Sequence, residues 1–134
     1  MLDGAPLFQL LYVSQLAADC DFGVVKDVVD VSRRRNPALG LTGALLFDGG
    51  HFCQLIEGAE GDALELMSRI QRDPRHTDLQ LLHAGSAAGA RLLNRWASGY
   101  CDSHELEPFL GSEGLRGQLA RDAFLSVLKG ADME

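Results

Sequence analysis

Residues 41–58 constrain the fold more than any other part of the sequence. They form two apolar runs, LTGALLF and HFCQLIEG, separated by Asp48, Gly49 and Gly50. Asp-Gly and Gly-Gly pairs favour the tight turns that join antiparallel strands, because glycine adopts positive φ without steric cost. The stretch therefore predicts a β-hairpin of two apolar strands.

Further strands and helices are predicted on both sides of this hairpin. Residues 6–14 form an apolar run that is typical of a central strand covered on both faces. Asp21 can cap a helix that continues through Arg35, and Asn36-Pro37 ends it because a residue before proline is disfavoured in the helical region. The remaining predicted elements are a helix over residues 62–72, strands over 79–84 and 90–100, and the turn GSAAG between those strands.

The order of these elements, β-α-β-β-α-β-β, predicts an α+β protein. Two helices on one face of a mixed sheet of four or five strands give the ferredoxin-like arrangement, extended here by one strand. The helix stripes predicted to face the sheet consist of Phe22, Val25, Val28, Val29 and Ser32 on the first helix, and of Leu64, Met67 and Ile70 on the second.

The chain changes character after residue 101. Residues 102–134 contain seven acidic and three basic residues, a net charge of −4 out of the total of −7. We predict a division into a domain of residues 1–101 and a helical cap of residues 102–134. The cap is expected to cover the open face of the sheet, because an open face would expose a large apolar patch. The apolar positions of the longer cap helix are Leu115, Leu119, Phe124, Val127 and Leu128.

Composition and charge exclude several classes of partner. The net charge of −7 and a pI near 5.0 argue against nucleic acid and against anionic membrane surfaces. We identify no apolar run of membrane-spanning length and no signal peptide, and therefore expect a cytoplasmic protein. The three cysteines are far apart, and His51 and His83 have no second ligand at a suitable spacing, so no metal site is expected.

Gln54 interrupts the apolar face of its strand, between Phe52 and Ile56. An unpartnered buried amide costs about 1–3 kcal/mol, so Gln54 needs partners. Tyr12 and Asn36 are two further polar residues that could converge with it above the sheet. They could be unrelated structural hydrogen bonders, or they could hold a planar heterocycle whose edge alternates carbonyl and N–H groups. The nearby pair Glu57-Gly58 is interpreted as a turn at the end of the strand.

Several separated motifs together resemble the BLUF family of flavin-using blue-light sensors. They are LLYVSQLA, SRRRNPALGLTGALLF, FCQLIEG, RIQRDPRH and RWAS, in the family's order from about residue 7 to residue 99. The resemblance implies the same ferredoxin-like fold, with flavin bound between the two helices.

The resemblance also implies roles for individual residues. Tyr12 matches the photoactive tyrosine and Gln54 the switching glutamine, while Asn36 matches the asparagine that holds the pyrimidine edge of the flavin ring. Trp96 matches the tryptophan of the last strand, and Ser98 stands where the family often has methionine, so both are assigned to signal output. The other residues expected to contact flavin are Val28, Ser32, Arg35, Arg75 and His76.

This resemblance implies a photocycle without a covalent bond to flavin. Light-excited flavin oxidises Tyr12, the proton passes through Gln54, and the altered amide changes its hydrogen bond to a ring carbonyl, which shifts the absorption to the red. FAD is the family's usual flavin, and FMN or riboflavin could also bind. The signal is expected to leave through a homo-oligomer or a separate effector protein, by way of the far side of the sheet and the acidic helices.

Two other classes of function stay open at this point. A non-photoactive module that binds a ligand or a protein could keep the same ferredoxin-like fold. An enzyme would need a nucleophile and a base that converge, and the sequence offers no such pair, so we expect a protein that is not an enzyme.

Overall fold

The computed structural model describes residues 7–87 and 90–134. Its main elements alternate as the sequence predicts, and a short C-terminal strand follows the last helix. In chain order they are β1 (Leu7–Leu16), α1 (Phe22–Ala38), β2 (Thr42–Phe47), β3 (His51–Ala59), α2 (Glu60–Arg72), β4 (His76–Ala87), β5 (Trp96–Tyr100), α3 (Ser103–Leu106), the 3-10 helix η1 (Glu107–Phe109), α4 (Gly117–Gly130) and β6 (Asp132–Met133).

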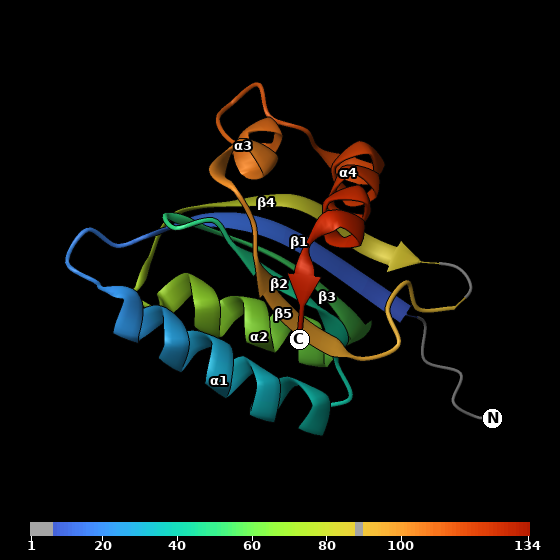
Figure 1. Cartoon of the computed structure of the whole chain (residues 1–134). Coiled ribbons are helices and arrows are strands. Elements are labelled where there is room, and N and C mark those ends of the chain that lie inside the picture. Colours follow the sequence, from blue (N-terminus) through green and yellow to red (C-terminus); the bar gives the residue numbers. More distant parts are fainter. Residues whose placement is uncertain (1–6, 88–89) are drawn as a thin grey trace.

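The strands of the described residues form one sheet in the order β4-β1-β3-β2-β5-β6. β1 pairs antiparallel with β3 and β4, and β2 pairs antiparallel with β3 but parallel with β5. The first four strands of this order, with α1 and α2 on one face, make the ferredoxin-like arrangement that the sequence predicts (Figure 1). The cap helices α3 and α4 lie over the opposite face.

Apolar clusters lie on the two faces of the sheet. One contains Leu10, Phe52 and Ile56 with residues of α1 and α2, and the other contains Cys53 and Leu55 with residues of the cap. The alternation of side chains along β3 accounts for this separation. Cys53 therefore faces away from Gln54.

The helix α1 begins as predicted and ends later. Asp21 accepts a hydrogen bond from the amide of Val24, so it is the N-cap. The helix then continues past Asn36 and includes Pro37, contrary to the sequence prediction. Its last carbonyls are satisfied beyond the proline, because Leu39, Gly40 and Leu41 donate backbone hydrogen bonds to them and Gly40 adopts a positive φ of 75°.

The C-terminal strands differ in length from the prediction. β4 is longer, since it follows β1 across two irregularities in register, and it includes Gly85–Ala87 of the predicted turn; residues 88 and 89 lie outside the described part. β5 is shorter and begins at Trp96, because residues 90–95 form a loop. The short strand β6 extends the sheet by pairing with Gly99 and Tyr100.

Three apolar residues predicted to face the sheet are instead exposed: Phe22 on α1, Leu64 on α2 and Leu119 on α4. Each belongs to the predicted apolar stripe of its helix, and Phe22 stacks on the half-exposed ring of Tyr100 at the end of β5. Residues nearer the centre of the stripes, such as Val25, Met67 and Phe124, are buried as expected. Periodicity therefore identified the buried side of each helix but overestimated its width.

Among the described residues, none of the helices combines the length and the apolar character needed to cross a bilayer.

Candidate functional site

A cleft lies between α1 and α2, above the centre of the sheet. It contains about 520 Å³ of space inside and at its mouth. All eight residues that the sequence comparison assigns to flavin contact line it: Tyr12, Val28, Ser32, Arg35, Asn36, Gln54, Arg75 and His76. The sequence analysis missed five further lining residues, which are Val31, Leu66, Arg69, Ile70 and Asp73.

These missed residues lie on the facing sides of the two helices or in the turn that follows α2. Their helical spacing places them next to residues that were recognised, because side chains three or four positions apart share one face of a helix. That spacing was the available signal in the sequence. It could not show which residues of one helix would oppose those of the other.

Tyr12 and Gln54 form the polar centre of the cleft floor. They are directly opposite each other on β1 and β3, and the Tyr12 hydroxyl donates a hydrogen bond to Oε1 of Gln54. Both side chains are buried. Burial raises the pKa of Tyr12 well above its ordinary value, and Cys53 and Asp73 contribute in the same direction, so the hydroxyl keeps its proton at neutral pH.

His76 forms the wall of the cleft beside Tyr12. Its Nδ1 atom is 2.8 Å from the Ser14 hydroxyl, its ring packs at 4.7 Å from the ring of Phe52, and its edge meets Tyr12 at 6.2 Å between ring centroids. Burial lowers the pKa of His76 to about 4, and the opposing effect of Asp73 is smaller. The imidazole is therefore neutral at pH 7.

Asn36 brings a buried amide into the cleft from the last turns of α1. Within the described part of the chain, its Nδ2 atom has no hydrogen-bond partner, although it is buried. Leaving a buried donor unsatisfied costs about 1–3 kcal/mol, so this atom is placed to meet an acceptor that enters the cleft.

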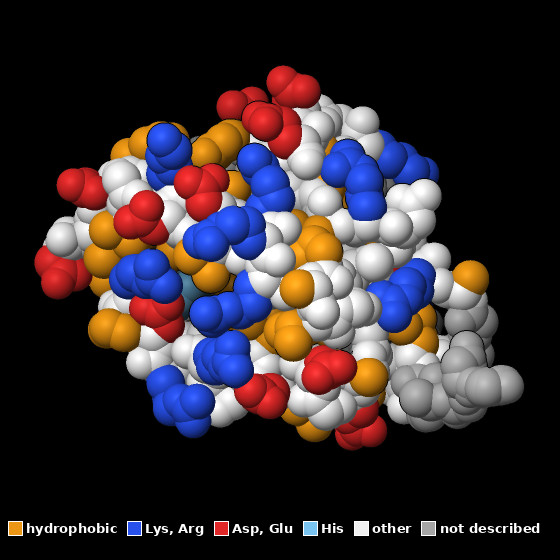
Figure 2. All heavy atoms as spheres, turned by 90° about the horizontal axis from the view of Figure 1, so that it is seen from below, with side chains coloured by type: hydrophobic (Ala, Val, Ile, Leu, Met, Phe, Trp, Pro, Cys, Tyr) orange, Lys and Arg blue, Asp and Glu red, His pale blue; other side chains and the backbone are white. Residues whose placement is uncertain are grey.

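Cationic side chains surround the mouth of the cleft. Arg35, Arg69 and Arg75 line it, and Figure 2 shows blue Lys and Arg side chains gathered over this helical face. Arg75 binds the carboxylate of Asp73 through several hydrogen bonds of 2.6–3.0 Å, which lowers the pKa of Asp73. Arg69 bonds to Glu65 at 2.7 Å. Although the chain as a whole is acidic, this opening is basic.

Trp96 and Ser98, the residues assigned to output, do not line the cleft. Trp96 is buried in the same apolar cluster as Tyr12 and packs against Gly43, where a Cβ atom would lie 1.9 Å from the carbonyl oxygen of Leu55 and 3.2 Å from the tryptophan ring. Ser98 is also buried, and its hydroxyl accepts a hydrogen bond of 3.0 Å from Arg33 of α1. Both therefore connect β5 to the neighbouring layer of the fold.

The structure shows that the interpretation of Glu57-Gly58 as a turn is wrong. Both residues lie inside β3, and Glu57 is fully buried on the face opposite Gln54. Its carboxylate accepts hydrogen bonds of 2.9–3.0 Å from the side chain of Gln9 and from the amides of Leu92 and Leu93. Those amides belong to the loop before β5, which sequence periodicity could not bring to this site.

Comparison with known proteins agrees with this geometry. The family model BLUF, described as "Sensors of blue-light using FAD", matches residues 7–99. The blue light- and temperature-regulated antirepressor BluF of Escherichia coli (strain K12) is 37% identical over 73 residues, which make up 54% of this chain and 18% of BluF. Photoactivated adenylate cyclase subunit beta of Euglena longa is 29% identical over 115 residues, or 86% of this chain and 13% of that subunit. The dark-state structure of BlrB, a BLUF protein, has a TM-score of 0.66 and 31% identity, and the match covers 78% of this chain and 79% of BlrB.

The chain belongs to the BLUF family, because the family model matches more than half of it. It is therefore a blue-light sensor that uses flavin, and the matched region is a sensor and not an enzyme. The chain spans less than a fifth of the length of the two curated relatives.

The residues of the cleft fit a flavin. The ring's pyrimidine edge carries carbonyl groups that the unpartnered Nδ2 of Asn36 can reach as a donor. Val28 and Ile70, from the two facing helices, offer apolar surfaces for a flat ring. Tyr12 and Gln54 supply a buried hydrogen-bonded pair at the floor.

Proposed function

We propose that Tyr12 and Gln54 form the light-responsive switch of this sensor. The observation that carries the proposal is the buried hydrogen bond from the Tyr12 hydroxyl to Oε1 of Gln54, in a cleft where Asn36 has an unsatisfied donor. With its oxygen engaged by Tyr12, Gln54 has its amide nitrogen left to donate to a ligand.

Bound flavin supplies an electron acceptor that blue light excites. With flavin bound as the acceptor, Tyr12 would give up an electron to it, and the Tyr12 hydroxyl proton would move along the existing hydrogen bond to Oε1 of Gln54. The Gln54 amide would exchange its donor and acceptor ends, by rotation or by tautomerisation, as the electron and the proton return to Tyr12. The changed hydrogen bond from Gln54 would then shift the absorption of the flavin to the red, and no general acid–base pair would be required.

We propose FAD as the flavin. The basic mouth formed by Arg35, Arg69 and Arg75 favours a phosphorylated flavin over riboflavin, because guanidinium groups bind phosphate through charge-assisted hydrogen bonds. Asp73 already engages Arg75 and Glu65 already engages Arg69, so Arg35 is the better candidate for this contact. Releasing the flavin by heat and separating it by chromatography against FAD, FMN and riboflavin identifies the species, and FMN alone or riboflavin alone would contradict the proposal.

We further propose that the signal leaves through Trp96 and Ser98 on β5 to a second copy of the chain or to a separate effector protein. Residues 102–134 would act as a helical cap that takes part in this output. The relative from Escherichia coli is named an antirepressor and the one from Euglena longa a cyclase subunit, so light sensing is coupled to different outputs among these relatives. Light scattering of dark and illuminated protein tests the homo-oligomer, and a monomer in both states would contradict it.

The light-minus-dark absorption spectrum of Tyr12→Phe tests the switch. We expect this variant to bind flavin and to lose the red shift, since it keeps the ring's packing and lacks the hydroxyl. Gln54→Leu should behave in the same way. Tyr100→Phe is the matched control, because Tyr100 lies half-exposed on β5 and should leave the red shift intact.

A normal, long-lived red shift in Tyr12→Phe would contradict the assigned role. A colourless purified protein that cannot be loaded with flavin would instead favour the non-photoactive binding module.

A further inference from the structure

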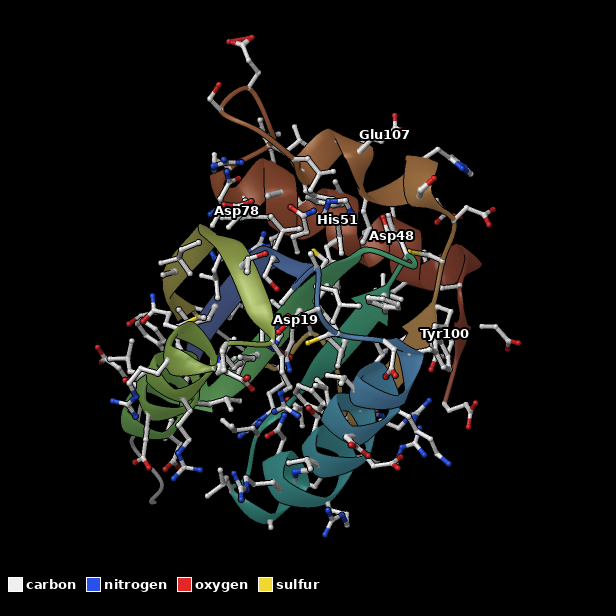
Figure 3. The ribbon with its side chains drawn as sticks, turned by 90° about the vertical axis from the view of Figure 1, so that its left-hand side faces the viewer. Asp19, Asp48, His51, Asp78, Tyr100 and Glu107 are labelled. Carbon is white, nitrogen blue, oxygen red and sulfur yellow. The ribbon has the colours of Figure 1, made fainter. Side chains whose placement is uncertain are left out.

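A second cleft lies at the N-terminal end of α1, away from the flavin site. It contains about 720 Å³ of space inside and at its mouth. Its floor is apolar and includes Leu16, Val25 and Phe47 from three different elements. We call this cleft the end groove. Figure 3 shows this end of the molecule, with Asp19, Asp48 and Tyr100 around the hairpin and the start of α1.

Two aromatic side chains stand at the rim of the end groove. Phe22 is 62% exposed and Tyr100 is 47% exposed, and their rings stack with centroids 6.0 Å apart. Large aromatic side chains are mostly withdrawn from solvent in a folded protein, and they are enriched where proteins bind partners. A stacked pair beside an apolar floor is suited to hold an apolar side chain of a partner.

The charged groups beside the end groove are mainly acidic. Asp19 and Asp21 precede Phe22, while Asp102 and Glu105 follow Tyr100. Asp21 and Asp48 line the groove, and Asp102 directly follows Cys101, which also lines it. Burial raises the pKa of Cys101 to about 12, and Asp48, Glu105 and Asp102 contribute in the same direction. The carboxylate of Asp48 already accepts hydrogen bonds from the backbone amides of Gly50 and His51.

The cations near this end do not balance these carboxylates. The guanidinium of Arg75 is bound to the carboxylate of Asp73. Lys26 lies on α1 one turn beyond Phe22 and is exposed. The opening of the end groove is therefore acidic, in contrast to the basic mouth of the flavin cleft.

We propose that the end groove is a docking surface for a basic segment of a partner protein that carries an apolar anchor side chain. The anchor would insert between the floor and the rings of Phe22 and Tyr100. Lysine or arginine residues beside it would face Asp19, Asp102 and Glu105. Charge complementarity favours this partner over a second copy of the same acidic end, because two such ends would repel each other.

The end groove is also in packing contact with the flavin cleft. A row of rings joins them: His76 packs on Phe52, Phe52 packs on Phe47 at 4.8 Å, and Phe47 meets the edge of Tyr100 at 6.5 Å. A change at Tyr12 and Gln54 would therefore reach the groove through closely packed side chains. This coupling rests on the proposed photoreceptor function, whereas the docking itself does not.

Three synthetic peptides of equal length test the docking on the flavin-loaded protein. One alternates leucine and lysine, one alternates leucine and glutamate, and one alternates serine and lysine, each with a dye that absorbs red light so that the measurement does not excite flavin. Fluorescence anisotropy measures affinity in the dark. We expect the leucine–lysine peptide to bind at least about tenfold more tightly than the other two. Equal binding of all three peptides, or of none, would overturn the proposal.

Variants locate the binding site. Phe22→Ser and Tyr100→Ser should each lower the affinity for the leucine–lysine peptide by about fivefold or more. Both side chains are exposed enough for the fold to tolerate the change. Leu119→Ser is the matched control, because Leu119 is 71% exposed on α4. Asp19→Asn should weaken binding, and Glu65→Gln on α2 should not. Wild-type affinity in both aromatic variants would overturn the assignment of the groove.

Illumination tests the coupling separately. We expect the affinity of the leucine–lysine peptide to differ by about fivefold or more between dark and illuminated protein, and not to differ in Tyr12→Phe. Equal affinities in the two states of a protein that shows its normal red shift would overturn the coupling and leave the docking surface standing. If the illuminated wild-type protein showed no red shift at all, the proposed function would instead be contradicted.

Discussion

The buried polar residues on the two faces of β3 differ in where their hydrogen-bond partners come from. On the cap side, the carboxylate of Glu57 is satisfied entirely by this chain, through Gln9, Leu92 and Leu93. On the helix side, Gln54 has its partner in Tyr12, yet Asn36 in the same cleft has a buried amide nitrogen without one among the described residues. The first arrangement holds a loop in place, and we propose that a ligand completes the second.

This difference separates a structural polar group from a functional one. A buried polar group is retained either because the fold supplies all its partners or because a ligand does. Both kinds interrupt apolar strands or helices, so burial alone does not distinguish them. The partners do, and the following variants test the distinction.

The largest expected effect is on the cap side. Glu57→Ala should lower the free energy of unfolding by about 3–5 kcal/mol, since it leaves the Gln9 side chain and two backbone amides without acceptors. Urea unfolding of the flavin-loaded protein measures the change. Glu113→Ala, in the exposed segment before α4, should change it by less than about 0.5 kcal/mol. Similar losses in the two variants would show that the loop finds other acceptors.

His76 should make the helix side sensitive to pH. Its folded pKa is about 4, whereas an unfolded histidine titrates near 6.5. As the pH falls from about 6.5 to about 4, the unfolded chain takes up a proton that the folded chain does not, so stability should fall by about 1–3 kcal/mol. Below that window the loss levels off.

Unfolding measurements across this pH range on the wild type and on His76→Gln isolate the histidine. The variant should have the flatter profile between pH 4 and 6.5. The lowered pKa of Asp73 acts below this window, because an aspartate with a depressed pKa loses its contribution only as the pH falls through that lower value. Parallel profiles would contradict the burial of a neutral His76.

Asn36→Ala should affect the ligand more than the fold. We expect flavin affinity to fall by about 1–3 kcal/mol, because the ring edge loses a donor. The stability of the flavin-free protein should change by less than about 1 kcal/mol, since the amide nitrogen has no partner to lose. Titration with flavin and urea unfolding of the flavin-free protein measure the two quantities. A loss of stability comparable to that of Glu57→Ala would make Asn36 a structural residue.

Ser98→Ala should have the smallest effect. Ser98 is buried, but its partner Arg33 is about half exposed and can turn to water. We therefore expect a loss of only about 0.5–1 kcal/mol in the free energy of unfolding, measured in urea. A loss above about 2 kcal/mol would show that Arg33 is held as firmly as the partners of Glu57.

Much of the fold follows from local signals in the sequence. The Asp48-Gly49-Gly50 turn joins β2 and β3, and Asp21 caps α1, because turn chemistry and capping depend on neighbouring residues alone. The order of strands and helices then leaves few arrangements other than the ferredoxin-like one. Polar interruptions of apolar faces suggested that Tyr12, Asn36 and Gln54 could converge. The other residues of the cleft could be named in advance only through the family resemblance, because their helices and strands are far apart in the chain.

The sequence by itself determined the alternation of elements, the turn between β2 and β3 and the presence of polar residues on otherwise apolar faces. Only the tertiary structure decided which partner each polar residue receives. Glu57 looked like part of a turn because its acceptor role depends on the amides of Leu92 and Leu93, in a loop that no local pattern connects to β3. Phe22 looked like a core residue because periodicity describes one helix, whereas exposure depends on what the tertiary structure packs against each side chain, and Phe22 stacks on a Tyr100 ring that is itself half exposed.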